Sequence, residues 1–112
     1  MGRVMKLTDG TFGDVVFRPG TAVLVEFWSP ASGRAGAEER LAVLERLALV
    51  HSDSVRVMRL DVEDNPVAAL VYGVRRVPLT ILFRGGEEIG RWDQTARLED
   101  IVSRLADGGS SR

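Results

Sequence analysis

The sequence predicts an α/β protein in which helices flank both faces of a central mixed sheet of about five strands. Segments with strand character alternate with segments of helical spacing, which indicates parallel strands joined by right-handed crossovers. Two strand-like segments near the C-terminus are separated by Gly85-Gly86, a pair typical of a tight hairpin turn, so these strands should be antiparallel. The expected order of elements is therefore β-α-β-α-β-α-β-β-α.

The N-terminal elements lead into a buried central strand. Val4–Leu7 is short and strand-like, and Thr8 and Asp9 offer side-chain oxygens that cap a following helix. Ala22–Trp28 is nearly continuously apolar, which is typical of a strand buried on both faces of a sheet. Glu26 is the one interruption of this run, so it is a candidate buried charge.

A long amphipathic helix is expected over about Ser32–His51. Its apolar residues follow one stripe, and its charged residues, Arg40 among them, are assigned to the other side. Val55–Asp61 alternates in the manner of a second inner strand. Asn65 and Pro66 then supply an N-cap and a first-turn proline for a short helix.

The C-terminal elements are a hairpin and a helix. Leu79–Phe83 and Glu87–Trp92 form the hairpin strands, and Leu98–Leu105 has the spacing of a final amphipathic helix. No linker and no internal repeat interrupts the pattern. We therefore expect one domain over residues 1–106 and a flexible polar tail over residues 107–112.

Composition excludes several classes of function. The 112-residue chain has a formal net charge of −1, so no overall field favours nucleic acid or an anionic membrane surface. No apolar run approaches the roughly 20 residues of a membrane-spanning helix, and no signal peptide is recognisable. Neither metal-ligand spacing nor a phosphate-binding loop stands out, so no metal and no cofactor is expected. These observations favour a cytoplasmic, monomeric protein without nucleic-acid or membrane partners.

Ordered motifs along nearly the whole chain, from Val4 to Leu105, resemble bacterial thioredoxins. The matching segments are Leu7-Thr8-Asp9, Val23–Trp28, Arg59–Val62, Asn65-Pro66, Tyr72–Arg75, Val77-Pro78 and Leu82–Glu87. The resemblance implies the thioredoxin fold. It also implies a cis peptide bond before Pro78 and a substrate groove beside that bond.

The chain contains no cysteine, although the family motif is Trp-Cys-Gly-Pro-Cys. The corresponding residues are Ala31, Ser32, Gly33, Arg34 and Ala35. Disulfide exchange needs one thiolate that attacks and a second thiol that resolves the mixed disulfide, and Ser32 and Ala35 supply neither. Thiol–disulfide chemistry is therefore excluded for this polypeptide. Two origins stay open: a protein naturally without these cysteines, or a thioredoxin whose cysteines were replaced.

Ser32 and Glu26 each have a structural and a chemical interpretation. Ser32 is expected to cap the long helix, and the alternative is a hydrogen bond to a thiol ligand. Glu26 stands where the resemblance places a buried acid that relays protons to the thiols. Without a thiol to serve, Glu26 is expected to form a buried ion pair with Arg59, where the family has a lysine. The alternative is general acid–base work in an unrelated reaction.

The resemblance implies a peptide-binding groove around Pro78. In the family, the backbone before this proline pairs with an extended segment, and that interaction needs no thiol. The alternative is a turn with a structural role only. The groove residues are Trp28, Ala31, Ser32, Gly33, Arg34, Arg76, Val77 and Pro78. Arg34 and Arg76 favour an acidic partner, unless they are solvated surface arginines.

These observations predict a redox-inactive, thioredoxin-like module that binds a protein or peptide. Its role would be that of an assembly factor, a chaperone or a subunit of a complex. The alternative is a protein-disulfide reductase with Ser32 and Ala35 in place of its cysteines. A third hypothesis is an enzyme that uses Ser32 or Glu26 for other chemistry.

Overall fold

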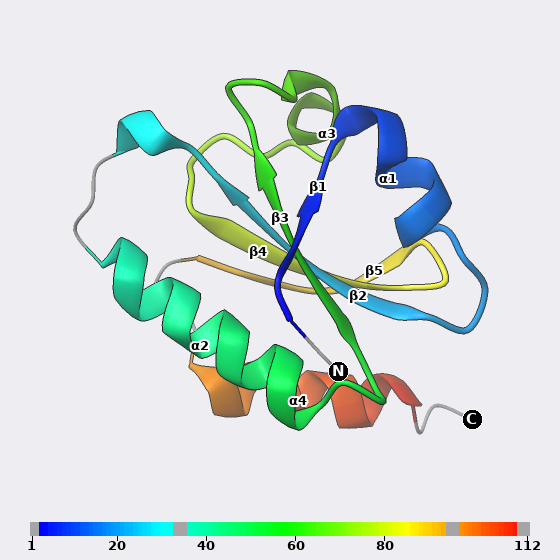
Figure 1. Cartoon of the computed structure of the whole chain (residues 1–112). Coiled ribbons are helices and arrows are strands. Elements are labelled where there is room, and N and C mark those ends of the chain that lie inside the picture. The colour runs from blue at the N-terminus through cyan, green and yellow to red at the C-terminus, as the bar shows by residue number, and fades with distance from the viewer. Residues whose placement is uncertain (1–2, 33–35, 94–96, 110–112) are drawn as a thin grey trace.

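A computed structural model of the chain describes residues 3–32, 36–93 and 97–109. Five strands form one sheet in the order β1-β3-β2-β4-β5 (Figure 1). These strands are β1 (Met5–Leu7), β2 (Ala22–Trp28), β3 (Arg56–Asp61), β4 (Leu79–Arg84) and β5 (Glu87–Trp92). Strands β1 and β2 pair with β3 in parallel, whereas β4 pairs antiparallel with both β2 and β5. The predicted mixed sheet is confirmed.

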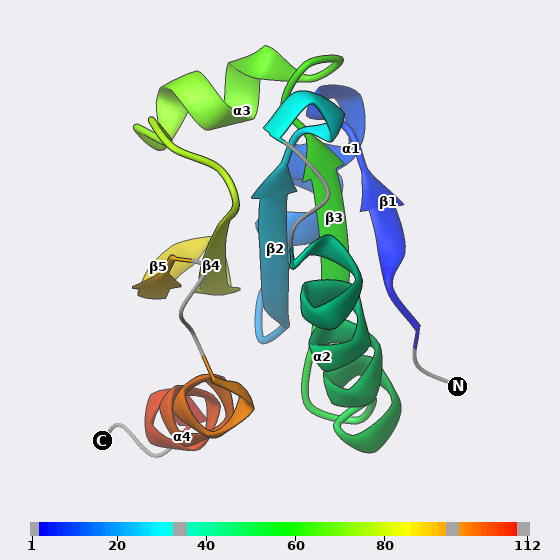
Figure 2. The ribbon, with the colours of Figure 1, turned by 90° about the vertical axis from the view of Figure 1, so that its left-hand side faces the viewer.

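Helices cover both faces of this sheet. The described residues form α1 (Asp9–Val16), the 3₁₀ turn η1 (Pro30–Ser32), α2 (Ala37–Val50), α3 (Pro66–Val71) and α4 (Leu98–Gly109). Helices α1 and α3 lie on one face, and α2 and α4 lie on the other (Figure 1 and Figure 2). The turn η1 follows β2 directly, at the end of the sheet where α3 also lies (Figure 2).

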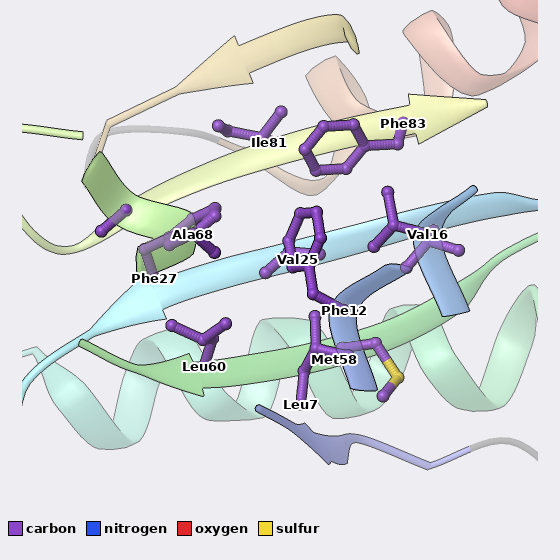
Figure 3. Close-up of a cluster of buried hydrophobic side chains, with 12 residues drawn as sticks. Leu7, Phe12, Val16, Val25, Phe27, Met58, Leu60, Ala68, Ile81 and Phe83 are labelled. Atoms are coloured by element: carbon purple, nitrogen blue, oxygen red, sulfur yellow. The ribbon is translucent and has the colours of Figure 1, made fainter. Parts of the chain in front are cut away.

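Side-chain alternation along β2 divides the core into two layers. Val23, Val25 and Phe27 belong to a buried cluster with residues of α1 and α3, and Figure 3 shows Val25 and Phe27 within it. Leu24 belongs to a second cluster with residues of α2 and α4. Because the side-chain period of a strand is two, Glu26 shares the face of Leu24 and lies beneath α2.

The first turns of α1 and α3 are tied together by exchanged hydrogen bonds. The Asp9 carboxylate accepts from the main-chain N–H groups of Val67 and Ala68 at 3.0 and 2.9 Å. Asn65 Oδ1 accepts from the Asp9 N–H at 2.9 Å. Asn65 occupies the predicted N-cap position of α3, but its side chain does not cap that helix; Asp9 does. Thr8 caps α1 as predicted.

The predicted start of the long helix is wrong. Helix α2 begins at Ala37 rather than at Ser32, and its N-cap is Gly36 with φ 76°. That positive φ lies outside the helical region and is one that glycine adopts without a Cβ penalty. Gly36 therefore sets the start of α2, and Ser32 ends η1 instead.

The predicted end of the last helix is also wrong. Helix α4 continues to Gly109, whereas the sequence predicted a polar tail from Asp107. The main-chain oxygen of Leu105 accepts from Arg84 Nη2 at 3.0 Å, which holds the last turns of α4 against β4. Residues 110–112 of the predicted tail lie outside the described residues.

The turn between β4 and β5 is the predicted glycine pair. Gly85 and Gly86 have φ values of 59° and 89°, the left-handed region that a tight hairpin turn requires at both central positions. A Cβ on Gly86 would lie 2.3 Å from Phe17 Cδ1, so a larger residue there would also have to displace the Phe17 ring.

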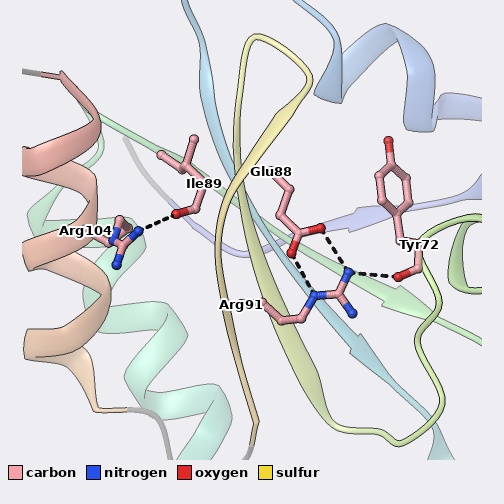
Figure 4. A network of polar contacts seen from close by, with 5 residues as sticks. All are labelled: Tyr72, Glu88, Ile89, Arg91 and Arg104. Atoms are coloured by element: carbon pink, nitrogen blue, oxygen red, sulfur yellow. Dashed lines mark hydrogen bonds and ion pairs between the residues drawn. The ribbon is translucent and has the colours of Figure 1, made fainter. Parts of the chain in front are cut away.

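Two arginines tie the edge strand β5 to both helical layers (Figure 4). Arg91 donates from Nε and Nη2 to the Glu88 carboxylate at 2.7 and 2.9 Å, and from Nη2 to the Tyr72 main-chain oxygen at 2.8 Å. These hydrogen bonds from Arg91 hold the pKa of Glu88 below its ordinary value. On the other side, Arg104 of α4 donates to the Ile89 main-chain oxygen at 3.0 Å.

Candidate functional site

The candidate site lies at the end of β2, where the cysteine motif of the resemblance would stand. Ala31 is exposed in η1, and Ser32 is the last residue of that turn. Gly33, Arg34 and Ala35 lie outside the described residues. The predicted cap role of Ser32 is wrong, because α2 starts only after Gly36. The effect of a helix dipole falls off within the first turn, so it is not focused on residue 32.

Ser29 and Glu63 fix the turn η1. The Ser29 hydroxyl donates to the Glu63 carboxylate, and the main-chain N–H of Ala31 donates to Ser29 Oγ at 3.1 Å and to Glu63 Oε2 at 3.0 Å. The hydrogen bond from Ser29, and then that from Ala31, lower the pKa of Glu63 below its ordinary value. Sequence reasoning missed both residues. The available signal was the turn-forming pair Ser29-Pro30 directly after a strand.

The strand β2 that leads into this turn carries a buried carboxylate. Glu26 is 1% exposed. Arg59 Nε lies 2.7 Å from Glu26 Oε1, so the structure brings together the two residues that the sequence paired. Arg40 Nε lies 3.2 Å from Glu26 Oε2. Each carboxylate oxygen thus accepts from a different guanidinium group.

Arg40 was assigned to the charged, outward side of its helix, and that assignment is wrong. It precedes Leu44 by one helical turn and Leu47 by two, and both leucines are buried. An arginine at that spacing lies in the apolar stripe. The spacing was the signal that could have placed Arg40 against the core next to Glu26.

Trp28 and Pro78 line different hollows. Arg59 Cζ lies 4.1 Å from the centroid of the Trp28 ring, so a cation covers one face of the indole. Trp28 lines a hollow of about 370 Å³ with Arg59, Lys6 and Leu41, on the β1 side of the sheet. Pro78 lines a cavity of about 40 Å³ with Glu26. Phe27 pairs with Leu79 in the antiparallel β2-β4 register, so Trp28 and Pro78 lie at the same end of these two strands.

The main chain before Pro78 is unpaired. The Val77–Pro78 peptide bond is cis, as the resemblance implied. Arg76 is exposed, and Val77 and Pro78 are half-buried. Within the described part of the chain, the main-chain groups of Arg76 and Val77 form no hydrogen bond. Unpaired main chain at the margin of a sheet is what strand addition by a peptide requires.

The chemistry available at this site is limited. Arginine does not lose its proton in proteins, so the two groups in contact with Glu26 cannot receive or supply one. Across residues 3–32, 36–93 and 97–109, no three His, Cys, Asp or Glu side chains form a group that could hold a metal ion. What the described site offers is main-chain hydrogen-bonding groups and an exposed arginine.

The parallel β1-β3-β2 unit, the antiparallel β4-β5 hairpin and the cis proline directly before β4 define a protein of thioredoxin fold. The family model described as Thioredoxin matches residues 3–107, and the chain belongs to the thioredoxin family. It is a member without the cysteine pair.

Several thioredoxins are similar to this chain over most of their length. The thioredoxin of Alicyclobacillus acidocaldarius is 33% identical over 103 residues, which cover 92% of this chain and 95% of that protein. The thioredoxin of Pyropia yezoensis is 31% identical over 86 residues, 77% of this chain and 78% of that protein. Thioredoxin 1 of Synechococcus elongatus is 32% identical over 83 residues, 74% of this chain and 76% of that protein.

No helix within the described ranges combines the length and the apolar character needed to cross a membrane.

Proposed function

We propose that this chain is a redox-inactive member of the thioredoxin family that binds a protein or peptide through the former active-site groove. In this role it serves as an assembly factor, a chaperone or a subunit of a complex in the cytoplasm. The observation that supports the proposal most directly is the unpaired main chain of Arg76 and Val77 beside the cis proline. Strand addition there uses main-chain hydrogen bonds and needs no thiol.

The rim of the groove carries positive charge in this proposal. Arg76 is exposed and precedes the unpaired segment, and Arg34 belongs to the undescribed segment before α2. Arginine forms bidentate hydrogen bonds with carboxylates, so an extended segment with acidic side chains is the partner that suits this rim. Such charges act mainly on the association rate.

A charge-reversal experiment tests this proposal. The double variant Arg34→Glu with Arg76→Glu should capture fewer partners from lysate of the source cell at low salt, and the difference should shrink as salt is raised. The matched control is Arg46→Glu with Arg56→Glu, which makes the same change in charge at two exposed positions outside the groove. Equal capture by wild type and the groove variant would place binding on another face.

A thioredoxin whose cysteines were replaced is the alternative, and family membership alone is compatible with it. The rest of the site argues against it. By the resemblance, Ala31, Arg34 and Arg76 also depart from the family pattern, as does Gly36, which sets the start of α2. Replacing two cysteines introduces none of these residues. The changes extend over the whole site rather than two positions, which supports a chain that diverged away from thiol chemistry.

Restoring the thiols separates these two proposals. In the variant Ser32→Cys with Ala35→Cys, residue 32 precedes α2 by more than one turn, so we expect a thiol pKa close to the unperturbed value of about 8.5 and little reduction of insulin disulfides. The pH dependence of alkylation measures the thiol pKa. A strongly lowered pKa with efficient insulin reduction would support the replaced thioredoxin.

A further inference from the structure

Helix α3 presents apolar side chains to solvent. Leu70 is 82% exposed, Val71 69% and Val67 58%. These residues have the spacing i, i+3 and i+4, so they lie on one face of the helix. Phe17, at the end of α1, is 50% exposed and lies beside them across a shared hollow. We call these four residues the α3 patch.

The α3 patch contains both a projection and a depression. A hollow of about 200 Å³ runs between α1 and α3, and Phe17, Val67 and Val71 line it together with the buried Phe12. Leu70 stands next to this hollow and is the most exposed of the large apolar side chains in the described residues. A surface that carries a knob beside a hole can pair with a copy of itself across a two-fold axis.

Opposite charges stand at the two ends of the α3 patch. Asp64 precedes α3, and Arg75 follows it; both side chains are exposed. Neither forms an ion pair or a hydrogen bond with another described residue. If two copies of α3 pack antiparallel, Asp64 of each copy faces Arg75 of the other. The same contact is then made twice, whereas a parallel arrangement would place like charges together.

We propose that the chain forms a two-fold symmetric dimer through the α3 patch, with the α3 helices antiparallel. Leu70 of each copy fills the hollow of the second copy, and Asp64 pairs with Arg75 of the second copy. This surface borders the unpaired main chain of Arg76 and Val77, because Arg75 directly precedes Arg76. The dimer departs from the monomer that the sequence predicted. A second copy is the occupant that uses the knob, the hollow and both charges at once.

Sedimentation equilibrium of the intact protein over a range of concentrations, at low salt, tests the proposal. Wild type should show a monomer–dimer equilibrium. Leu70→Gln should raise the dissociation constant by about tenfold or more, because the most exposed apolar contact is lost. The control Leu49→Gln makes the same change at an apolar position on α2 that is 66% exposed, and it should leave the equilibrium unchanged. Circular dichroism checks that both variants keep the fold.

Charge exchange tests the antiparallel arrangement. Asp64→Arg and Arg75→Asp should each weaken the dimer, and the double variant should restore it, because every pair regains opposite charges. A wild-type protein that stays monomeric at every concentration would overturn the proposal, as would a double variant no tighter than either single one. Capture of a different protein by the α3 patch, with no self-association, would overturn it as well.

Discussion

Glu26 is a carboxylate in the core whose two oxygens are each matched by an arginine. Its side chain is 2% exposed, and the side chains of Arg40 and Arg59 are 17% and 18% exposed. Burial of an unpaired charge is strongly unfavourable, so the cluster is stable only as a set. Arg59 has a further contact, because its guanidinium lies over the Trp28 ring.

Removal of the central carboxylate should be costly. Glu26→Gln leaves two largely buried guanidinium groups without their anion, and we expect the free energy of unfolding to fall by about 3–5 kcal/mol. Equilibrium unfolding in urea measures this. The triple variant Glu26→Leu, Arg40→Leu, Arg59→Met removes all three charges and should lose less stability than Glu26→Gln. Unchanged stability of Glu26→Gln would show that the carboxylate is not held as the structure places it.

The sequence predicted two members of this cluster, Glu26 and Arg59, but not Arg40. Glu26 interrupts an apolar strand, and the resemblance places a cation at Arg59, so two members followed from local pattern and family motif. Arg40 did not, because charged residues on a helix are assigned to solvent by default. Its contact with Glu26 depends on where α2 lies over the sheet, which no local pattern contains.

At the scale of elements, the turn η1 is held by a carboxylate from a different loop. Glu63 follows β3, and it accepts from Ser29 and from the Ala31 main chain. Strand β3 is paired in register with β2, so the end of β3 lies beside the start of η1. Glu63 therefore couples the shape of η1 to the protonation of a single side chain.

Acidification should release this turn. The pKa of Glu63 is lowered in the folded protein, chiefly by the hydrogen bond from Ser29. The stabilisation is therefore present above the unfolded pKa of about 4.3 and is lost as pH falls through the lower folded value. The chemical shift of the Ala31 amide proton, followed from pH 7 downward, should show a transition at a pH below the ordinary pKa of glutamate.

Two variants serve as controls for that titration. Ser29→Ala should move the transition of the Ala31 amide to higher pH, because the largest contribution to the lowered pKa is removed. Glu63→Gln should abolish the transition. If the midpoint of the wild-type transition lay at or above the ordinary pKa of glutamate, the hydrogen bonds from Ser29 and Ala31 would not hold Glu63 as described.

Element types followed from the sequence more reliably than element boundaries. The apolar run of β2, the glycine pair before β5 and the Thr8 cap are local signals, and each lies where predicted. The predicted start of α2 is wrong because serine is a common N-cap residue, which favoured Ser32. The helix instead begins after Gly36, whose φ is positive. The antiparallel direction of β4 against β2 depends on the path from α3 to Pro78, which residue periodicity does not encode.

At the scale of the whole molecule, β5 is an edge strand of the sheet, and polar contacts connect it to the helices on both faces. Strand β5 is half-buried or exposed throughout. It is connected to the end of α3 through Arg91 and to α4 through Arg104, as Figure 4 shows. The two arginines act on opposite sides of the strand, so each helical layer holds β5 by a separate polar contact.

Loss of these contacts should be modest and additive. Arg91 and its partner Glu88 are about one-third exposed, and Arg104 is exposed, so solvent weakens these contacts. We therefore expect Arg91→Ala and Arg104→Ala each to lower the free energy of unfolding by about 0.5–1.5 kcal/mol. The two arginines share no partner. In urea unfolding, the free energy lost by the double variant should therefore equal the sum of the two single losses within about 0.5 kcal/mol. A double variant much less stable than the sum would mean that β5 detaches as a unit once both contacts are lost. The control Arg56→Ala removes an exposed arginine at the start of β3 and should change stability by less than about 0.5 kcal/mol.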